Sequence, residues 1–163
     1  MNSRFFPNDV RFPTSGAAEA ARLKGNQMTH IRSLDDENMD AILPPKSEFS
    51  GVARLFNPLQ VGMLCFVADL ISAGYKAPLA AKIARRVMEA HQGQPEVEQW
   101  AIVHTDNGNV SSLPYDQTEL RTGFISGSRL AFALVVDLRL YAERVSAAIA
   151  GTPRVIGGDD EVA

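Results

Sequence analysis

The sequence predicts an α+β protein in which a helical half is followed by a small antiparallel sheet with a C-terminal helix. Apolar residues recur at helical spacing before Gly93 and at strand-like spacing after it. An Asn107-Gly108 pair separates two short strand-like runs, and Asn-Gly is the strongest short-range hairpin signal. The 163 residues, 45% of them hydrophobic, suffice for one or two small domains with a packed core.

The N-terminal region shows no sustained period. We expect residues 1–27 to form a disordered tail, with Met28 as a candidate second start site. A short helix is predicted from Asp35 to Leu43, because its acidic first turn suits the helix dipole and two prolines follow it.

The clearest predicted helix runs from Leu59 to Ala73. Asn57 is a suitable N-cap, Pro58 suits the first helical position, and Gly74 suits the residue after the end. This helix is apolar on nearly all sides, so it must be buried by its own domain or by a second subunit.

A second central helix is predicted from Pro78 to His91. Its apolar stripe comprises Leu79, Ile83 and Val87, and the opposite side carries basic residues at spacings of three and four. The helix therefore has one face to pack and one basic face to present.

Residues 98–151 are predicted to form a ββ(turn)βα module. The hairpin turn centred on Asn107-Gly108 would pair Thr105 with Val110, and Leu130–Val136 suits a buried strand. Asp137 would cap a helix whose apolar face packs on this sheet. We expect the acidic tail, residues 152–163, to be disordered, which leaves residues 28–93 as the helical domain.

Several classes of protein are disfavoured. The single cysteine, Cys65, permits neither an intramolecular disulfide nor a multi-cysteine zinc site, and it is expected to be a buried structural thiol. The histidines lack metal-ligand spacing, so no metal, cofactor or enzymatic activity is predicted. No run is long and apolar enough for a membrane span or a signal peptide, so we expect no membrane partner and a cytoplasmic location.

Charge is unevenly distributed along the chain. The net charge of −3 argues against a generic nucleic-acid binder, but residues 46–91 carry six basic and three acidic side chains between two acidic flanks. Basic side chains on a rigid helix could neutralise phosphates. The alternative is an ordinary solvated helix face.

A sequence pattern over residues 42–87 resembles the distal part of a MerR-type winged helix-turn-helix domain. The matching motifs are, in order, Leu43-Pro44-Pro45-Lys46, Gly51, Arg54-Leu55-Phe56 and the Asn57-Pro58 cap, followed by the two central helices. The resemblance implies a winged-helix-like domain, a homodimer and a partner or effector module, for which residues 98–151 are available. It also implies two leading helices, the second being a recognition helix. Residues 1–45 form either a degenerate version of them or none.

These observations lead to two hypotheses. In the first, the protein is a DNA-binding transcriptional regulator of MerR-like type that contacts the backbone of double-stranded DNA, with an unknown effector. In the alternative, it is a protein-interaction module that dimerises through the apolar helix 59–73 and has no nucleic-acid role. The candidate DNA-binding residues of the first hypothesis, with Arg54 taken from the wing of the family, are Lys46, Arg54, Lys76, Lys82, Arg85 and Arg86.

Overall fold

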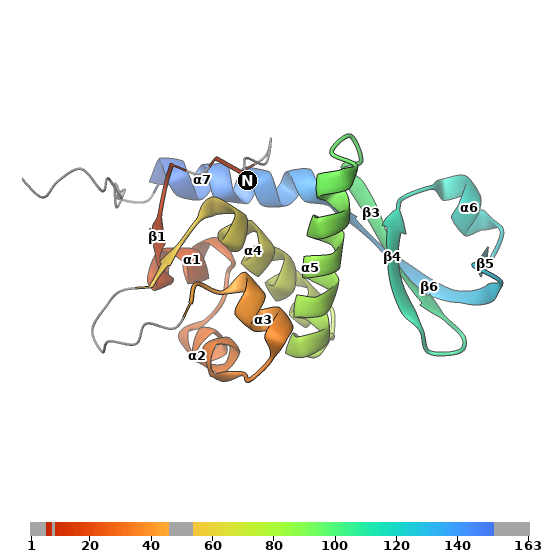
Figure 1. The fold of residues 1–163 in the computed structure, drawn as a ribbon, viewed down its shortest axis with the longest axis horizontal. Helices are drawn as coiled ribbons and strands as arrows, with labels where there is room; N and C mark the ends of the chain where they lie inside the picture. The colour runs from red at the N-terminus through yellow and green to blue at the C-terminus, as the bar shows by residue number, and fades with distance from the viewer. Residues whose placement is uncertain (1–5, 8, 46–53, 152–163) are drawn as a thin grey trace, which may run out of the picture. The chain divides into compact units, whose positions relative to one another are not determined.

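The computed structural model describes residues 6–7, 9–45 and 54–151. It confirms the α+β class (Figure 1). The described residues divide into two compact units, one formed by those up to residue 85 together with 140–151 and the other by residues 86–139. Within the described residues, no helix is long and apolar enough to cross a membrane.

The first unit is mainly helical. Its two short strands pair antiparallel, with Phe12 opposite Phe56. Helix α5 begins in this unit and ends in the other unit. Helix α7 begins in the other unit and continues into this one. The elements are β1 (Phe12–Pro13), α1 (Thr14–Ala20), α2 (Gly25–Ser33), α3 (Glu37–Ile42), β2 (Leu55–Phe56), α4 (Pro58–Ser72), the first part of α5 (Ala77–Gly93) and most of α7 (Leu138–Gly151).

Helix α4 forms the core of this unit. The predicted N-cap is confirmed, because Asn57 Oδ1 accepts from the Gln60 amide at 2.8 Å and Gln60 Oε1 accepts from the Asn57 amide at 2.9 Å. All residues from 61 to 68 are buried. Helices α1 and α3 both contact α4, and Tyr141 of α7 stacks on Phe66 with ring centroids 5.1 Å apart. The apolar sequence of α4 is thus accounted for within one copy of the chain.

The predicted disordered tail over residues 1–27 is wrong for its described part. Phe6 is only 3% exposed, and its ring approaches α4 so closely that a Cβ on Gly62 would lie 2.4 Å from it. Phe12 and Ala17 are also buried, and α1 and the start of α2 occupy the rest. Each short element contributes only one or two core residues, so no sustained period marks them in the sequence. Residues 152–163, the predicted acidic tail, lie outside the described residues.

The second unit contains a four-stranded antiparallel sheet in the order β4-β3-β6-β5. The buried residues Ala101, Val103 and Ile125 form a core on which Tyr115 and Leu120 pack. The elements of the unit, which also holds the end of α5, are β3 (Gln99–Thr105), β4 (Val110–Pro114), α6 (Gln117–Arg121), β5 (Phe124–Ile125) and β6 (Ser128–Asp137).

The hairpin exists as predicted, but its register differs by one residue. His104, not Thr105, lies opposite Val110. The predicted turn needs positive φ at both Asn107 and Gly108, and only Gly108 has it, at 83°. The side chain of Asn107 instead accepts a hydrogen bond from the Asn109 amide at 3.2 Å. The connection is therefore a longer turn with glycine in the left-handed position.

The C-terminal helix does not belong to the sheet module as predicted. From Leu140 onward α7 is part of the helical unit, where Arg144 Nη1 lies 3.0 Å from Asp69 Oδ1 of α4. The boundaries 28–93 and 98–151 are therefore replaced by divisions within α5 and within α7. The apolar face of α7 was recognisable, but the sequence does not specify which surface covers it.

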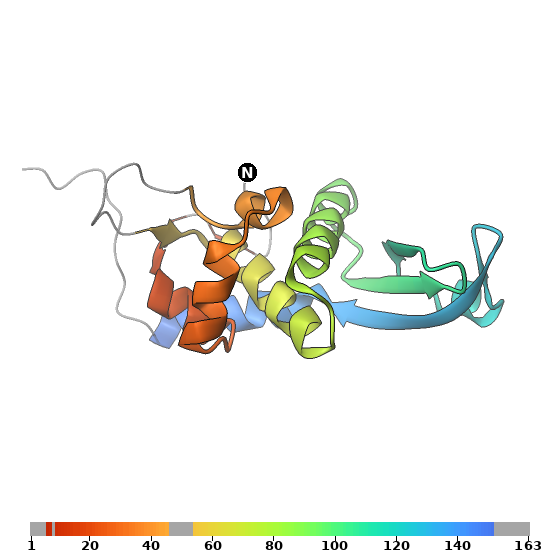
Figure 2. The same ribbon diagram turned by 90° about the horizontal axis from the view of Figure 1, so that it is seen from below.

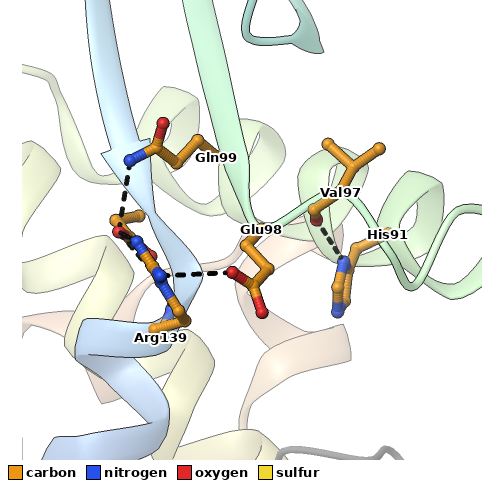
Figure 3. A network of polar contacts seen from close by, with 6 residues as sticks. His91, Val97, Glu98, Gln99 and Arg139 are labelled. Atoms are coloured by element: carbon orange, nitrogen blue, oxygen red, sulfur yellow. Dashed lines mark hydrogen bonds and ion pairs between the residues drawn. The ribbon is translucent and has the colours of Figure 1, made fainter.

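A network of polar contacts fixes the two strand ends at the start of the sheet (Figure 3). Asp137 caps α7 by accepting from the Arg139 amide at 3.0 Å, which confirms its predicted role, and Arg139 Nη1 also lies 3.3 Å from Glu98 Oε2. The Leu138 amide donates to the Glu98 carbonyl at 2.9 Å. His91 Nδ1 lies 2.9 Å from the Val97 carbonyl oxygen. Hydrogen bonds from the Arg139 guanidinium lower the pKa of Asp137 to about 2.

This depressed pKa predicts a pH dependence of stability. The charged form of Asp137 contributes stability above the ordinary carboxyl pKa, and the contribution is lost as the pH falls towards about 2. The Asp137→Asn variant keeps an N-capping side chain but lacks the titration. We expect the difference in free energy of unfolding between wild type and variant, measured by urea titration, to shrink between pH 5 and pH 2. A difference that stays constant over this range would contradict the role of the ion pair.

Candidate nucleic-acid interface

Helices α1 and α2 are consecutive and are joined by a short turn. Ala20 ends α1, Gly25 begins α2, and the four residues between them make the turn. Arg22 adopts a left-handed φ of 57°, and the Leu23 amide bonds back to the Ala18 carbonyl at 2.9 Å. This is the Schellman geometry that stops a helix and redirects the chain, and it usually employs glycine.

Two faces of α2 differ in burial and chemistry. Met28 and Ile31 are 4% and 1% exposed and anchor the helix in the helical unit. The opposite face carries exposed polar residues at positions i, i+3, i+4 and i+7, which fall on one side of a helix. We call this set the α2 polar stripe: Asn26, Thr29, His30 and Ser33.

The chemistry of the α2 polar stripe suits the edges of base pairs. An amide, two hydroxyls and an imidazole can each donate or accept hydrogen bonds, and asparagine is a characteristic partner of adenine in the major groove. The exposed cationic residues Arg22 and Lys24 precede the stripe in the turn. No acidic residue occurs between positions 20 and 34. The helix therefore presents a polar face with positive charge at its N-terminal end.

One end of α5 lies beside α2. A hollow of about 290 Å³ is lined by Asn26 and His30 of α2 together with Ile71 of α4 and Ala77 of α5. The preceding residue, Lys76, is exposed. The predicted site residue Lys76 is thus brought close to the α2 polar stripe.

The predicted basic ridge on α5 is only partly formed. Lys82 and Arg86 are exposed, at a spacing of four residues. Arg85 is half-buried, and its Nη1 donates to Asn38 Oδ1 of α3 at 3.2 Å. Arg85 therefore joins two helices, and the expectation that it faces outward with its neighbours is corrected.

The predicted wing contributes little that can be described. Arg54 is half-buried and, with Asp40 and Leu43, lines a hollow of about 250 Å³. Lys46 and Gly51 lie outside the described residues.

Cys65 is buried in α4, with its Sγ 3.5 Å from the Ala20 carbonyl oxygen. Burial raises the pKa of the thiol to about 11. A protonated thiol of this kind is a poor nucleophile. The sequence interpretation of Cys65 as a buried structural residue is confirmed.

The sequence did not predict the α2 polar stripe, because residues 1–45 taken together show no excess of basic residues. That segment holds five basic and six acidic residues. The acidic residues between 35 and 40 offset the charge of the basic residues at 20–34, a stretch that contains no acidic residue. The spacing of Met28 and Ile31, three residues apart among polar neighbours, was the signal in the sequence for a short helix with one polar face.

Comparisons with known proteins add no assignment. No protein-family model matches the chain, and neither does any curated protein.

The conformation of Arg22 predicts opposite effects on stability and on DNA affinity. The Arg22→Gly variant should relieve the left-handed strain and raise the free energy of unfolding by about 1 kcal/mol. Removal of one cation should weaken binding to a non-specific DNA duplex and reduce the salt slope by about 0.9. Arg22→Lys is the matched control for charge. If affinity for DNA is unchanged in Arg22→Gly while stability rises, Arg22 has no role in phosphate contact.

Proposed function

We propose that the protein is a DNA-binding transcriptional regulator, acting in the cytoplasm, with α2 as its recognition helix. The observation that carries the proposal is the α2 polar stripe, which is held outward by the burial of Met28 and Ile31 on the opposite face. In helix-turn-helix proteins the second helix enters the major groove and its N-terminal residues contact base edges. Asn26 and Thr29 occupy such positions.

Phosphate contacts would come from the exposed cations around this helix. Arg22 and Lys24 lie in the turn before α2, and Lys76 lies at the start of α5 beside it. Lys82 and Arg86 extend the set along α5. Such contacts position a protein on the duplex and supply salt-dependent affinity, whereas base contacts supply specificity.

The order of elements supports a relationship to the MerR-type domain. A strand and three helices precede the segment that resembles the wing, and a strand followed by α4 and α5 comes after it. The resemblance implies two leading helices, which α1 and α2 would supply, and α3 is an additional helix before the wing. The implied homodimer would offer two copies of α2 to a palindromic site.

The alternative of an interaction module that dimerises through the apolar helix 59–73 loses its main support. That helix is covered by α1, α3 and α7 of the same chain. Its apolar character therefore needs no partner to explain it.

Two paired variants test the division between base and backbone contacts. In Asn26→Ala/His30→Ala we expect at least tenfold loss of preference for a duplex enriched from a random library over a random-sequence duplex, because base contacts are worth about 1–3 kcal/mol each. In Lys82→Ala/Arg86→Ala we expect weaker binding to both duplexes and a salt slope reduced by about 2.

Fluorescence anisotropy between 50 and 200 mM salt measures both quantities. Gln92→Ala/Gln94→Ala, which alters one exposed residue in the last turn of α5 and one exposed residue directly after it, is the control and should match wild type. Equal preference for the enriched duplex in wild type and the α2 variant would refute α2 as the recognition helix.

A further inference from the structure

The hollow beside α2 combines polar and apolar lining residues. It measures about 290 Å³ and is formed by α2, the turn before it, the end of α4 and the start of α5. Figure 2 shows α4 and α5 joined by a short turn, in yellow-green, directly after which Ala77 begins α5. The polar lining residues are Asn26, Gln27 and His30, and the apolar ones are Leu23, Ile31, Ile71 and Ala77.

Burial separates the two kinds of lining residue. Ile31 and Ala77 are 1% and 8% exposed, and the two other apolar residues are half-buried, so hydrocarbon forms the floor of the hollow. Asn26 and His30 are exposed and belong to the α2 polar stripe, so they form its rim. A group that enters from solvent therefore meets hydrogen-bonding side chains first and an apolar surface behind them.

The Asn26 side chain is held in place and still has groups to offer. Its Oδ1 accepts a hydrogen bond from the Gln27 amide at 3.0 Å. The described residues take up no other hydrogen-bonding group of this side chain, which leaves one lone pair of Oδ1 and both N–H groups of Nδ2. Adenine presents a donor at N6 and an acceptor at N7 in the major groove, and an asparagine amide complements this pair of groups.

The charge around the hollow suits the approach of a duplex. No acidic residue of the described part of the chain lines it, whereas Glu19 and Asp40 each line one of the other hollows of the helical unit. Lys76, which directly precedes Ala77, is exposed. A base edge can therefore reach the hollow without passing a carboxylate, and a cation is available beside it for a phosphate.

The apolar floor narrows the choice of base pair. Among the groups that distinguish base pairs in the major groove, the C5-methyl group of thymine is the apolar one, and the others are donors or acceptors. A methyl group placed on the floor is removed from water against hydrocarbon. A donor or acceptor of a G·C pair placed there would lose its water without gaining a partner. An A·T pair thus matches the rim and the floor together.

We infer that α2 selects A·T pairs, with Asn26 bonded to adenine and the C5-methyl group of thymine seated in the hollow. The inference rests on the proposed function, because it names the bases that α2 reads. The two contacts differ in chemistry, one being a pair of hydrogen bonds and the other apolar burial. They can therefore be removed one at a time.

Base analogues test each contact from the DNA side, where the fold of the protein is left unchanged. The probe is the duplex enriched from a random library, in which each thymine is replaced in turn by uracil, which lacks only the methyl group. We expect at least one replacement to weaken the binding of wild type about fourfold, the value of burying one methyl-sized group. Replacement of an adenine by 7-deazaadenine, which lacks the N7 acceptor, should weaken binding at least about fivefold.

Two variants assign these contacts to residues, with fluorescence anisotropy as the measurement. Ile71→Thr places a hydroxyl group in the hollow and should abolish the difference between thymine and uracil, while the difference between adenine and 7-deazaadenine remains. Asn26→Ala should show the reverse. A random-sequence duplex with uracil in place of thymine is the control for altered duplex stiffness, and wild type should bind it as it binds the thymine form.

The outcomes separate this inference from the proposed function. An enriched duplex without A·T pairs, equal binding of every uracil-substituted duplex and its parent, or a thymine–uracil difference that persists in Ile71→Thr would overturn the inference. The proposed function would survive these results if Asn26→Ala/His30→Ala still loses preference for the enriched duplex. Failure of wild type to enrich any duplex would overturn both.

Discussion

Burial of α4 on nearly all sides is the constraint on which the helical unit depends. Full burial of a large apolar side chain contributes about 1.5–3 kcal/mol, and α4 buries a continuous series of them. To cover such a helix the chain must bring elements from both ends, α1 from the N-terminal region and α7 from the C-terminal region. Small residues on α1 and the glycine that faces Phe6 permit the close approach. The outward position of α2 is a consequence, since its Met28 and Ile31 are held in the same unit.

The elements with strong local signals were predictable from the sequence. Helix α4 has a cap, a proline and an apolar run, and β3 and β4 flank an Asn-Gly turn, so the local chemistry points to the correct structure. The covering partner of α7 was not predictable, because its apolar face fits either a sheet or a helix. The segment with α1 and α2 was missed because short helices that each bury two residues produce no period that an 11-residue window can register.

In the candidate site, too, the sequence predicted the features that local spacing determines and not those that tertiary contacts determine. Lys82 and Arg86 were identifiable as outward cations because helical spacing fixes the face on which they lie. Arg85 has the same spacing but meets Asn38 of α3, a tertiary contact that no local pattern encodes. The left-handed φ of Arg22 is a further tertiary outcome, since the residue itself carries no turn signal. In the proposed function, Arg22, Lys82 and Arg86 supply affinity and the α2 polar stripe supplies discrimination.

In the proposed function α2, and not the basic face of α5 alone, meets the bases of a DNA duplex. The most direct measurement is a titration of ¹⁵N-labelled protein with an enriched duplex, followed by amide chemical shifts. We expect the largest changes at Asn26, Thr29 and His30, with smaller changes near Lys76 and Lys82 and none in the buried centre of α4. Changes confined to α5 or to the sheet, with α2 unaffected, would contradict it.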